Sequence, residues 1–312
     1  MDSRIFSKQM ILSLKKHLHK NTIKYITYPN FVFLCGKYFE DSTYLNSNRG
    51  VIERYISKQA DDVFIVLSEK LWEDEFNSNI DLLTFEEFLA EISDCIILLV
   101  ESPGSFCELG AFSYADKLFS DKLLVVIDNK YCGDKSFIIT GPAAKIKKDG
   151  SDVVYAPLDG SGLLSSHELR EAILKRINSF RSKRVSNNKR KTNDNENSIF
   201  LNSFIIELLE IIKLTQPILR EDLLDIYKIV KGFSSFTFIK RDGSRFNTEI
   251  KYNYILKLLH SVKLININNG YVSTDYYKRV QNLMFKYYNK AENVERNKLL
   301  CRKYRYKGSV SI

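Results

Sequence analysis

The sequence has few of the residues that mark secreted, metal-binding or membrane-spanning proteins. Its 312 residues include 5 cysteines, 5 prolines and 13 glycines, and no two cysteines form a C-x-x-C pair. An odd number of cysteines argues against a disulfide framework and suits a reducing compartment. The longest apolar run, Cys95–Val100, is far shorter than the ~20 residues of a membrane span. Lysine and histidine interrupt the apolar residues of the first 20 positions, which therefore do not resemble a signal peptide. We therefore expect a cytoplasmic protein with no membrane partner.

Several motifs of common enzyme classes are also missing. The sequence contains no G-x-x-x-x-G-K-[ST], H-E-x-x-H, G-x-G-x-x-G or EF-hand pattern. Its four histidines, at 17, 19, 167 and 260, show no metal-binding spacing with the cysteines. We expect no metal and no bound cofactor.

Charge divides the chain into an acidic and a basic part. Residues 1–180 hold 21 Lys/Arg and 26 Asp/Glu, whereas residues 181–312 hold 26 Lys/Arg and 12 Asp/Glu. A basic half favours a polyanionic partner, nucleic acid first, although a solvated basic surface would have the same composition. Residues 181–197 contain one apolar residue, Val185, and have the composition of a solvated linker. We predict domains over 1–180 and 198–290, followed by a basic and aromatic tail over 291–312.

The first domain has the pattern of an α/β fold with a doubly wound parallel sheet. Five short runs are almost continuously apolar, as in strands that are buried on both faces. They are Phe31–Cys35, Val63–Leu67, Cys95–Val100, Leu123–Ile127 and Val153–Ala156. Amphipathic helical patterns occur between them, at 84–93 and 165–179, and each opens with a capping-box signal. Ligands of such sheets bind beyond the carboxyl ends of the strands, so the residues there are the first candidates for a site.

Glu108, which follows the third strand, allows two interpretations. It lies three residues after Ser105, as in an S-x-x-E capping box, and this structural role requires no chemistry. Alternatively, a carboxylate in the first turn of a helix at this edge can attack the anomeric carbon of a sugar and form a covalent glycosyl–enzyme. The small residues Gly104 and Ser105 would let the sugar approach the backbone closely. The two roles are compatible in different states of one protein.

The segment D-C-I-I-L-L-V-E-S-P-G-S-F-C-E-L-G-A-F, together with F-L-C-G at 33–36, resembles the nucleoside 2-deoxyribosyltransferase-like superfamily. The resemblance implies that Glu108 is the nucleophile. The deoxyribosyltransferases usually have an Asp two residues before the glycine, where this chain has Ser102 beside Glu101. That departure puts an ordinary nucleoside substrate in doubt. Relatives complete their sites across subunits, so the resemblance also implies a homo-oligomer.

The same segment, the later S-F-x-x-x-G-P at 136–142 and the two-part layout more closely resemble retron-associated effector proteins. These pair a ribosyltransferase-like domain with a winged-helix DNA-binding domain. The resemblance implies a toxin that cleaves an N-glycosidic bond in anti-phage defence, with NAD or a related nucleotide as the substrate. It also implies restraint by a reverse transcriptase and its multicopy single-stranded DNA and RNA.

The candidate substrate-binding residues follow from the strand ends and from the resemblance. Arg49 could bind a phosphate, or it could be a surface arginine, and Glu69 could be a second acid or a solvated one. Cys35 matches the first strand of the superfamily, and we interpret it as a wall of the site. The full set is Cys35, Gly36, Arg49, Glu69, Glu101, Ser102, Gly104 and Ser105.

The second half has the pattern of a winged helix-turn-helix. Amphipathic helical patterns cover Ile199–Leu214, Leu219–Val230 and Glu249–Val262, and Asn269-Gly270 between apolar runs is a strong hairpin signal. A second hairpin is expected at Asp242-Gly243. Bases that alternate with aromatics suit single-stranded DNA, because lysine and arginine neutralise phosphates and tyrosine stacks on unpaired bases. The predicted nucleic-acid contacts are Lys240, Arg241, Arg245, Lys251, Lys257, Lys263, Lys278, Arg279, Arg302, Lys303 and Arg305.

Three other interpretations remain open at this stage. The first domain could sense a nucleotide without turnover while the second binds DNA, or the basic domain could dock a protein. A phosphoribohydrolase also uses a Gly-Thr…Glu motif, but it usually has a longer glycine-rich loop than Pro103-Gly104-Ser105. The need for a nucleophile at Glu108 separates an enzyme from a sensor.

Overall fold

The computed structural model describes residues 6–20, 29–72, 82–114, 122–159, 162–187, 198–239, 245–275, 296, 298 and 299. The chain forms two compact units, one over 29–191 and the other from 1–28 together with 192–312. The first helix, α1 (Lys8–Lys20), packs against helices of the second unit although it precedes the sheet in the chain. No helix within the described ranges is long and apolar enough to span a membrane.

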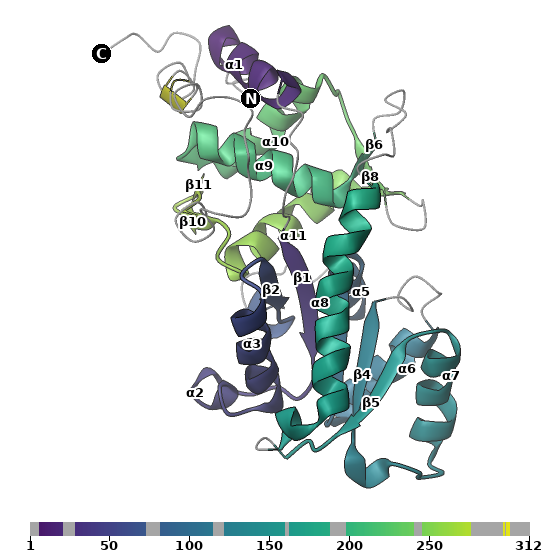
Figure 1. Ribbon diagram of the computed structural model, residues 1–312. Helices are drawn as coiled ribbons and strands as arrows, with labels where there is room; N and C mark the ends of the chain where they lie inside the picture. The colour runs from purple at the N-terminus through teal and green to yellow at the C-terminus, as the bar shows by residue number, and fades with distance from the viewer. Residues whose placement is uncertain are drawn as a thin grey trace. The chain divides into compact units, whose positions relative to one another are not determined.

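The first unit is built on a five-stranded parallel sheet in the order β2-β1-β3-β4-β5 (Figure 1). Its strands are β1 (Asn30–Cys35), β2 (Val63–Val66), β3 (Cys95–Val100), β4 (Leu123–Asp128) and β5 (Asp152–Ala156). All four pairings are parallel, with Val32 opposite Cys95 and Leu98 opposite Val125. These pairings confirm the predicted strands and their parallel arrangement. Strands that are apolar along their whole length are typical of sheets with helices on both faces.

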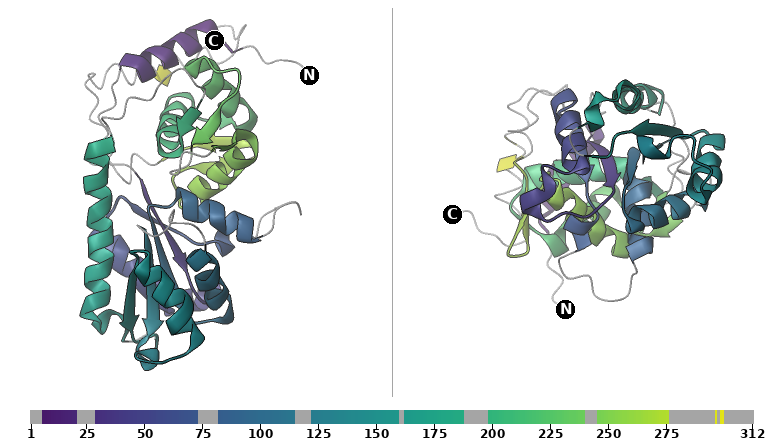
Figure 2. Two further views of the ribbon diagram at one scale, coloured as in Figure 1. Left: turned by 90° about the vertical axis from the view of Figure 1, so that its right-hand side faces the viewer. Right: turned by 90° about the horizontal axis from the view of Figure 1, so that it is seen from below.

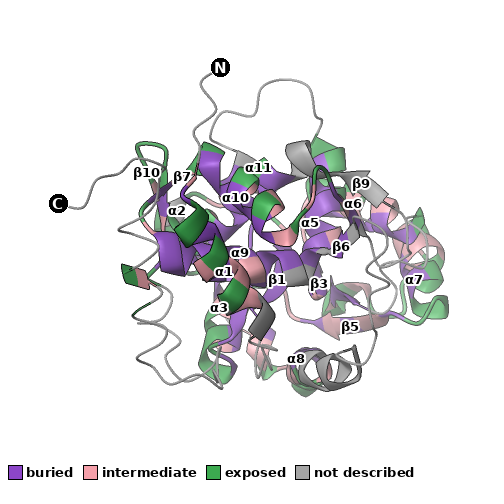
Figure 3. Cartoon of the chain, turned by 90° about the horizontal axis from the view of Figure 1, so that it is seen from above, coloured by how far each residue is buried: buried purple, intermediate pink, exposed green. Residues whose placement is uncertain are grey.

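Helices cover the two faces of this sheet. The first-unit helices are α2 (Asp41–Tyr44), α3 (Asn48–Gln59), α4 (Glu69–Trp72), α5 (Leu82–Ile92), α6 (Pro103–Tyr114), α7 (Ala144–Lys148) and α8 (His167–Asn187), with a π-helical segment at Ile139–Ala143. Helices α3 and α8 pack on one face, and Figure 2 shows α8 running along the sheet. Helices α5, α6 and α7 contact β1, β3 and β5. In Figure 3 strand β1 is coloured as buried, whereas much of α7 is exposed.

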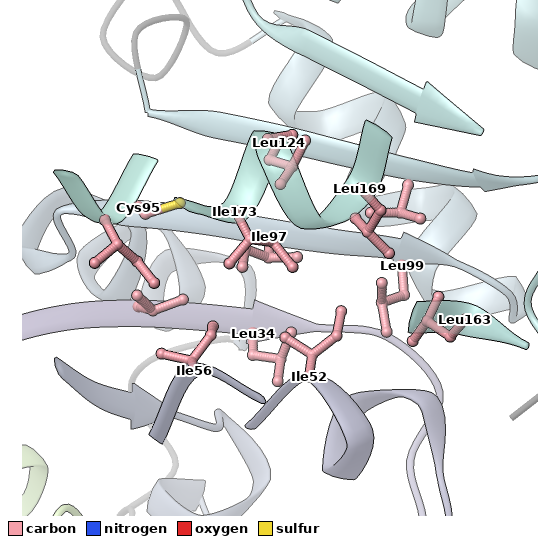
Figure 4. Close-up of a cluster of buried hydrophobic side chains, with 14 of the residues drawn as sticks. Leu34, Ile52, Ile56, Cys95, Ile97, Leu99, Leu124, Leu163, Leu169 and Ile173 are labelled. Carbon is pink, nitrogen blue, oxygen red and sulfur yellow. The ribbon is translucent and has the colours of Figure 1, made fainter. Parts of the chain in front are cut away.

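Alternate side chains of the strands point to the face covered by α3 and α8 and form a core there. Figure 4 shows Leu34, Ile97 and Leu124 of the sheet against Ile52 of α3 and Ile173 of α8, and all five side chains are buried. Each fully buried Leu or Ile contributes about 1.5–3 kcal/mol to folding through removal of apolar surface from water. Successive strand residues point to opposite faces, so the neighbours of these residues pack on the other side of the sheet.

Two buried cations of the first unit, Arg176 and Lys122, hydrogen-bond to groups of other elements. Arg176 of α8 is 8% exposed, and its Nη2 lies 2.8 Å from the carboxylate of Asp152 and 3.1 Å from the carbonyl oxygen of Leu123. This pairing ties α8 to β4 and β5. The buried Lys122 donates from Nζ to the carbonyl oxygens of Glu91 (3.1 Å) and Ser93 (3.0 Å) at the end of α5. A cation at a helix C-terminus satisfies carbonyls that lack helical partners.

Three details differ from the sequence-based prediction. Residue 84 lies inside α5, which is already helical at Leu82, so Thr84 is not its cap. Helix α8 begins at His167, and Ser166 Oγ rather than Ser165 accepts the Leu169 N–H (3.3 Å), because Ser165 belongs to a 3-10 turn. Residues 181–187, assigned to the linker, continue α8; they contain no glycine or proline to end a helix. The rest of the linker lies outside the described residues.

The second unit combines helices with two small sheets. It contains α9 (Leu201–Thr215), α10 (Arg220–Lys231), α11 (Thr248–Ser261) and strands β6 (Ser198–Phe200), β7 (Ile218–Leu219), β8 (Thr237–Ile239), β9 (Arg245–Asn247), β10 (Asn266–Asn268) and β11 (Tyr271–Ser273). The strands pair in the orders β10-β11-β7 and β6-β8-β9. Phe204 and Phe238 meet edge to face in its core, with their ring centroids 4.9 Å apart.

The predicted hairpin at Asn269-Gly270 is confirmed. Strands β10 and β11 are antiparallel with Asn268 opposite Tyr271, and both turn residues have positive φ, 50° at Asn269 and 78° at Gly270. Two-residue turns of this kind match the twist of the flanking strands, and Asn-Gly tolerates the left-handed conformation best. The antiparallel pairing of β8 with β9 also agrees with a hairpin at Asp242-Gly243, although the turn itself lies outside the described residues.

Candidate active site

The carboxyl ends of β1, β2 and β3 lie next to one another because these strands are neighbours in the sheet. The chain leaves the centre of the sheet in opposite directions from β1 and β3, so a crevice is expected between their ends. The residues that follow these strands include Gly36, Glu69 and Glu101. This edge therefore collects the residues that sequence reasoning selected from distant segments.

The start of α6 is organised by two serines rather than by Glu108. The helix begins at Pro103, and the Ser102 Oγ accepts the N–H of Ser105 (3.3 Å). In return, the Ser105 Oγ accepts the backbone N–H groups of Glu101 (2.9 Å) and Ser102 (2.8 Å). The interpretation of Ser105 and Glu108 as a capping box is wrong, because Glu108 lies in the second turn of the helix, beyond the free N–H groups.

Glu108 is partly buried and one of its carboxyl oxygens has no partner. Oε2 is inaccessible to solvent and makes no hydrogen bond. The pKa of Glu108 is raised to about 8, chiefly by burial and then by the carboxylates of Glu86 and Glu69, while the Arg49 guanidinium opposes them. A buried carboxyl oxygen without a donor is costly when ionised. The raised pKa favours the protonated form of Glu108 near neutral pH, and Oε2 has no hydrogen-bond partner in the protein.

Glu86 of α5 is a second buried acid at this site, and sequence reasoning missed it. Burial raises its pKa and the Glu69 carboxylate adds to that effect, while a side-chain hydrogen bond with Ser68 opposes them. Glu86 is 9% exposed. A signal existed: Glu86 lies three positions before Leu89 and four before Ala90, at the apolar face of the helix. A glutamate there is not expected unless it has a partner or a function.

Arg49 is the cation of the site and is only 2% exposed. The Ser47 side chain accepts the Gly50 N–H (3.1 Å) and so fixes the first turn of α3, which carries Arg49. The Arg49 Nη2 lies 2.7 Å from the Glu69 Oε1, but neither Nη2 nor Nε makes a hydrogen bond. The interpretation of Arg49 as a surface arginine is therefore wrong. Its guanidinium is buried and forms an ion pair with Glu69, but two of its nitrogen atoms have no hydrogen-bond acceptor.

Cys35 forms part of the wall behind this cluster. Its thiol is buried, and burial raises its pKa well above the ordinary value, with a further increase from the Glu108 carboxylate. The thiolate is the nucleophilic form of cysteine, so such an environment disfavours attack by Cys35. The site thus offers carboxyl groups rather than a thiol for covalent chemistry.

Glu101 connects the ends of the strands. Its Oε1 accepts the Lys37 N–H (3.1 Å), and its Oε2 accepts from Asn48 Nδ2 (2.6 Å). Gly36 lies directly against it, while Gly104 is exposed in the first turn of α6. The structure thus brings the predicted substrate-binding set to one edge of the sheet. Within the described residues, no group of three or more His, Cys, Asp or Glu side chains could hold a metal ion.

The predicted nucleic-acid contacts are placed less completely. Arg245 lies on β9 and Lys251 on α11, where only their backbone is described; Lys257 is partly buried on α11, and Lys263 is exposed just after it. The others lie outside the described residues: Lys240, Arg241, Lys278, Arg279, Arg302, Lys303 and Arg305.

Comparison with known proteins identifies a family and two relatives. The model of the STM3845 retron effector protein family matches residues 45–267. An Escherichia coli protein of retron Ec73, provisionally named a ribosyltransferase/DNA-binding protein, is 27% identical over 278 residues, which are 82% of this chain and 79% of that protein. A protein of retron Ec86 from Escherichia coli, with the same provisional name, is 38% identical over 142 residues, which are 45% of this chain and 42% of that protein. The match to the Ec86 protein thus spans less than half of its length.

Proposed function

This chain belongs to the STM3845 retron effector protein family, and from that premise we propose that it is an anti-phage toxin that cleaves an N-glycosidic bond with Glu108 as the nucleophile. The observation that carries the proposal is the unpartnered Oε2 of Glu108 beside the carboxyl ends of β1 and β3. The provisional names of the Ec73 and Ec86 relatives, which include ribosyltransferase, support a glycosyl transfer of this class.

The reaction takes two displacements at the anomeric carbon. The Glu108 carboxylate forms a bond to C1′ while the C1′–N bond breaks and its electron pair leaves with the base. A water molecule then attacks C1′, the bond to Glu108 breaks, and the proton of the water passes to a neighbouring carboxylate. Glu86 is our candidate for this group, because it is buried and close enough to raise the pKa of Glu108. With a neutral base, protonated Glu86 would first donate the proton that the base needs to leave.

The excess of acidic groups at the site favours a substrate whose base carries a positive charge before it leaves. Glu69, Glu86 and Glu108 lie within electrostatic reach of one another, and the charge of Arg49, the cation that acts on Glu108, is already offset by Glu69. A positive charge on the ribosylated base would favour the ionised form of Glu108 and so prepare it for attack. The nicotinamide of NAD carries such a charge. We therefore propose NAD or a related nucleotide as the substrate.

The second unit supplies the proposed DNA-binding and docking function. Helices α9, α10 and α11 followed by the β10–β11 hairpin, with β7 paired to β11, have the element order of a winged helix. We propose that it binds the multicopy single-stranded DNA and the reverse transcriptase of the retron, which restrain the toxin until phage infection. Membership of a retron effector family supports these partners. We further propose that the chain forms a homo-oligomer, which light scattering of the purified protein would test.

A nucleotide sensor without turnover is the second candidate. The raised pKa of Glu108 favours it, because a carboxyl group protonated at neutral pH can donate a hydrogen bond to a ligand without attacking it. A sensor would bind NAD or a nucleotide and leave the N-glycosidic bond intact.

The test compares wild type, Glu108→Gln and the control Glu171→Gln, which removes an exposed carboxyl on α8. Each protein is incubated with NAD and a panel of nucleosides, alone and with the retron reverse transcriptase and its DNA, and the products are read by mass spectrometry. We expect free base from wild type and the control but not from Glu108→Gln. Equal base release by Glu108→Gln would exclude Glu108 as the nucleophile. Binding of nucleotide without release in every condition would favour the sensor.

A further inference from the structure

Both oxygens of the Glu101 carboxylate accept hydrogen bonds from other segments of the first unit. Oε1 accepts the backbone N–H of Lys37 (3.1 Å), which follows β1, and Oε2 accepts from Asn48 Nδ2 (2.6 Å), at the start of α3. A contact of 2.6 Å to an ionised acceptor is at the short end for an amide donor. Glu101 therefore joins the end of β3 to two segments that are about 50 to 65 residues away in the chain.

Asn48 extends this connection to a fourth segment. It is 6% exposed, and its Nδ2 also donates to the carbonyl oxygen of Leu158 (3.2 Å), just after β5. One amide group thus bridges the ends of β3 and β5 while it anchors the first turn of α3. We call Glu101, Asn48 and the Lys37 N–H the clamp.

The turn after β1 is shaped to fit the clamp. A Cβ atom on Gly36 would lie 3.1 Å from Glu101 Oε1, 3.2 Å from the Leu99 Cβ and 3.4 Å from the Arg49 Cδ. The first two distances are tighter than most real Cβ contacts, so a side chain here would push Glu101 or Leu99 away, and the close approach of Glu101 favours glycine. Gly36 thus lies close to both Glu101 and Arg49.

The clamp therefore controls two parts of the candidate site. Asn48 is the neighbour of Arg49 in the first turn of α3, and Lys37 is the neighbour of Gly36 in the turn that faces Glu101. We propose that Glu101 is a positioning residue, whose carboxylate holds the Gly36 turn and the first turn of α3 and so places Arg49 against the substrate, without itself contacting the reacting atoms. The proposal rests on the proposed N-glycosidase function and adds a residue that acts through Arg49.

A swap of hydrogen-bonding groups tests the clamp. In Glu101→Gln one oxygen becomes an NH2 group, so either the Lys37 N–H or the Asn48 Nδ2 faces a donor instead of an acceptor. In Asn48→Asp two carboxylates face each other. The double variant restores a donor opposite an acceptor at this contact and keeps the total charge of the wild type, but it loses the hydrogen bond from position 48 to the Leu158 carbonyl oxygen. We expect Glu101→Gln to lower kcat by about 10- to 100-fold with KM changed less than about threefold, as for a misplaced site. We expect the double variant to recover most of that loss.

A substrate contact gives a different result. If Glu101 bound the substrate directly, Glu101→Gln would raise KM, and Asn48→Asp would add its own loss instead of restoring activity. That outcome overturns the proposal. Glu171→Gln is the matched control for loss of a carboxylate and should keep the kcat and KM of the wild type.

Hydrogen exchange measures the clamp without any substrate. In Glu101→Ala the Lys37 N–H loses its acceptor, so we expect deuterium uptake at 36–37 to rise about tenfold or more in rate, with uptake on α8 unchanged. Unchanged exchange at 36–37 overturns the proposal. If wild type releases no base but exchange rises as expected, the N-glycosidase function has failed and the clamp remains as a structural feature. If Glu101→Ala does not fold, exchange in Glu101→Gln at 48–50 serves as the readout.

Discussion

Arg49 Nη2 lies 2.7 Å from Glu69 Oε1, and this ion pair joins the first turn of α3 to the start of α4 beside Glu108. The arginine side chain is 3% exposed and the glutamate side chain 20%. The pair keeps a cation within electrostatic reach of Glu108 while it leaves the Nε and Nη2 hydrogen atoms without acceptors. Such a guanidinium is preorganised to bind an oxygen atom of a ligand.

Removal of the Arg49 charge should destabilise the protein and shift its pH dependence. In Arg49→Met the Glu69 carboxylate loses its partner, which we expect to lower the free energy of unfolding by about 2 kcal/mol, less than for a fully buried pair because Glu69 is partly exposed. Glu108 loses the one cation that lowers its pKa, so any base release should need a higher pH. Denaturant titration and a pH–rate profile check both effects. Arg54→Met on the exposed face of α3 is the control, and equal effects of the two variants would contradict the prediction.

Glu86→Gln should distinguish the role of the proposed proton donor, Glu86, from that of the proposed nucleophile, Glu108. The variant removes a carboxylate that raises the pKa of Glu108, so the alkaline shift of the pH–rate profile should become smaller. It also removes the proposed proton donor, and we expect kcat for neutral bases to fall by about 10²–10⁴-fold. A cationic base needs no proton, so its release should fall less. A uniform loss for both kinds of base would argue against Glu86 as the acid.

The raised pKa of Glu108 should appear as a loss of stability with rising pH. The folded protein holds this proton up to about pH 8, whereas the unfolded chain releases it near pH 4.5. The contribution of Glu108 to stability is therefore complete below about pH 4.5 and is lost as the pH rises to about 8. We expect Glu108→Gln to match wild type near pH 4.5 and to exceed it by about 4–5 kcal/mol at pH 8.5, because each unit of pKa difference corresponds to about 1.4 kcal/mol. Denaturant unfolding at both pH values measures this, and a pH-independent difference would contradict the assigned pKa.

Arg176→Ala should lower stability without altering chemistry. The variant leaves Asp152 and the Leu123 carbonyl oxygen without their buried donor, so we expect a loss of about 2–3 kcal/mol in the free energy of unfolding. Lys175→Ala removes an exposed partner of the same aspartate, 3.6 Å away, and should cost less than about 0.5 kcal/mol. Base release per folded molecule should be unchanged in both variants.

Alkylation should divide the cysteines by burial. Cys107 and Cys132 are exposed, whereas Cys35 and Cys95 are buried, and burial raises the pKa of Cys95 to about 12. Iodoacetamide at pH 8 should therefore modify Cys107 and Cys132 in the native protein, and Cys35 and Cys95 only after denaturation. Peptide mass spectrometry reads the sites. Rapid native alkylation of Cys35 would show that the thiol is accessible and ionised, and would reopen its role in the chemistry.

Local patterns in the sequence determined the strands, most helices and the edge at which the site lies. The apolar run Cys95–Val100 is long enough and branched enough to predict a strand buried on both faces, and Asn269-Gly270 predicts its turn from backbone sterics alone. Parallel strands then place Gly36, Glu69 and Glu101 at one edge, whatever the packing of the helices. The limits of α8 were less well predicted, because a polar helix and a polar linker have the same composition.

Only the tertiary structure decided what each polar side chain does. The sequence does not show that Arg49 and Glu86 are buried or which groups Glu101 binds, because charge pairing, loss of solvent and hydrogen-bond partners arise between segments that are far apart in the chain. The capping-box pattern at Ser105 and Glu108 fits the sequence but not the helix, which begins two residues earlier, at Pro103. The pKa of a carboxyl group depends on burial and on nearby charges, and both are set by packing. The sequence by itself therefore determined where the candidate site lies, and packing decided which of its acids are buried, paired or left with an oxygen that has no partner.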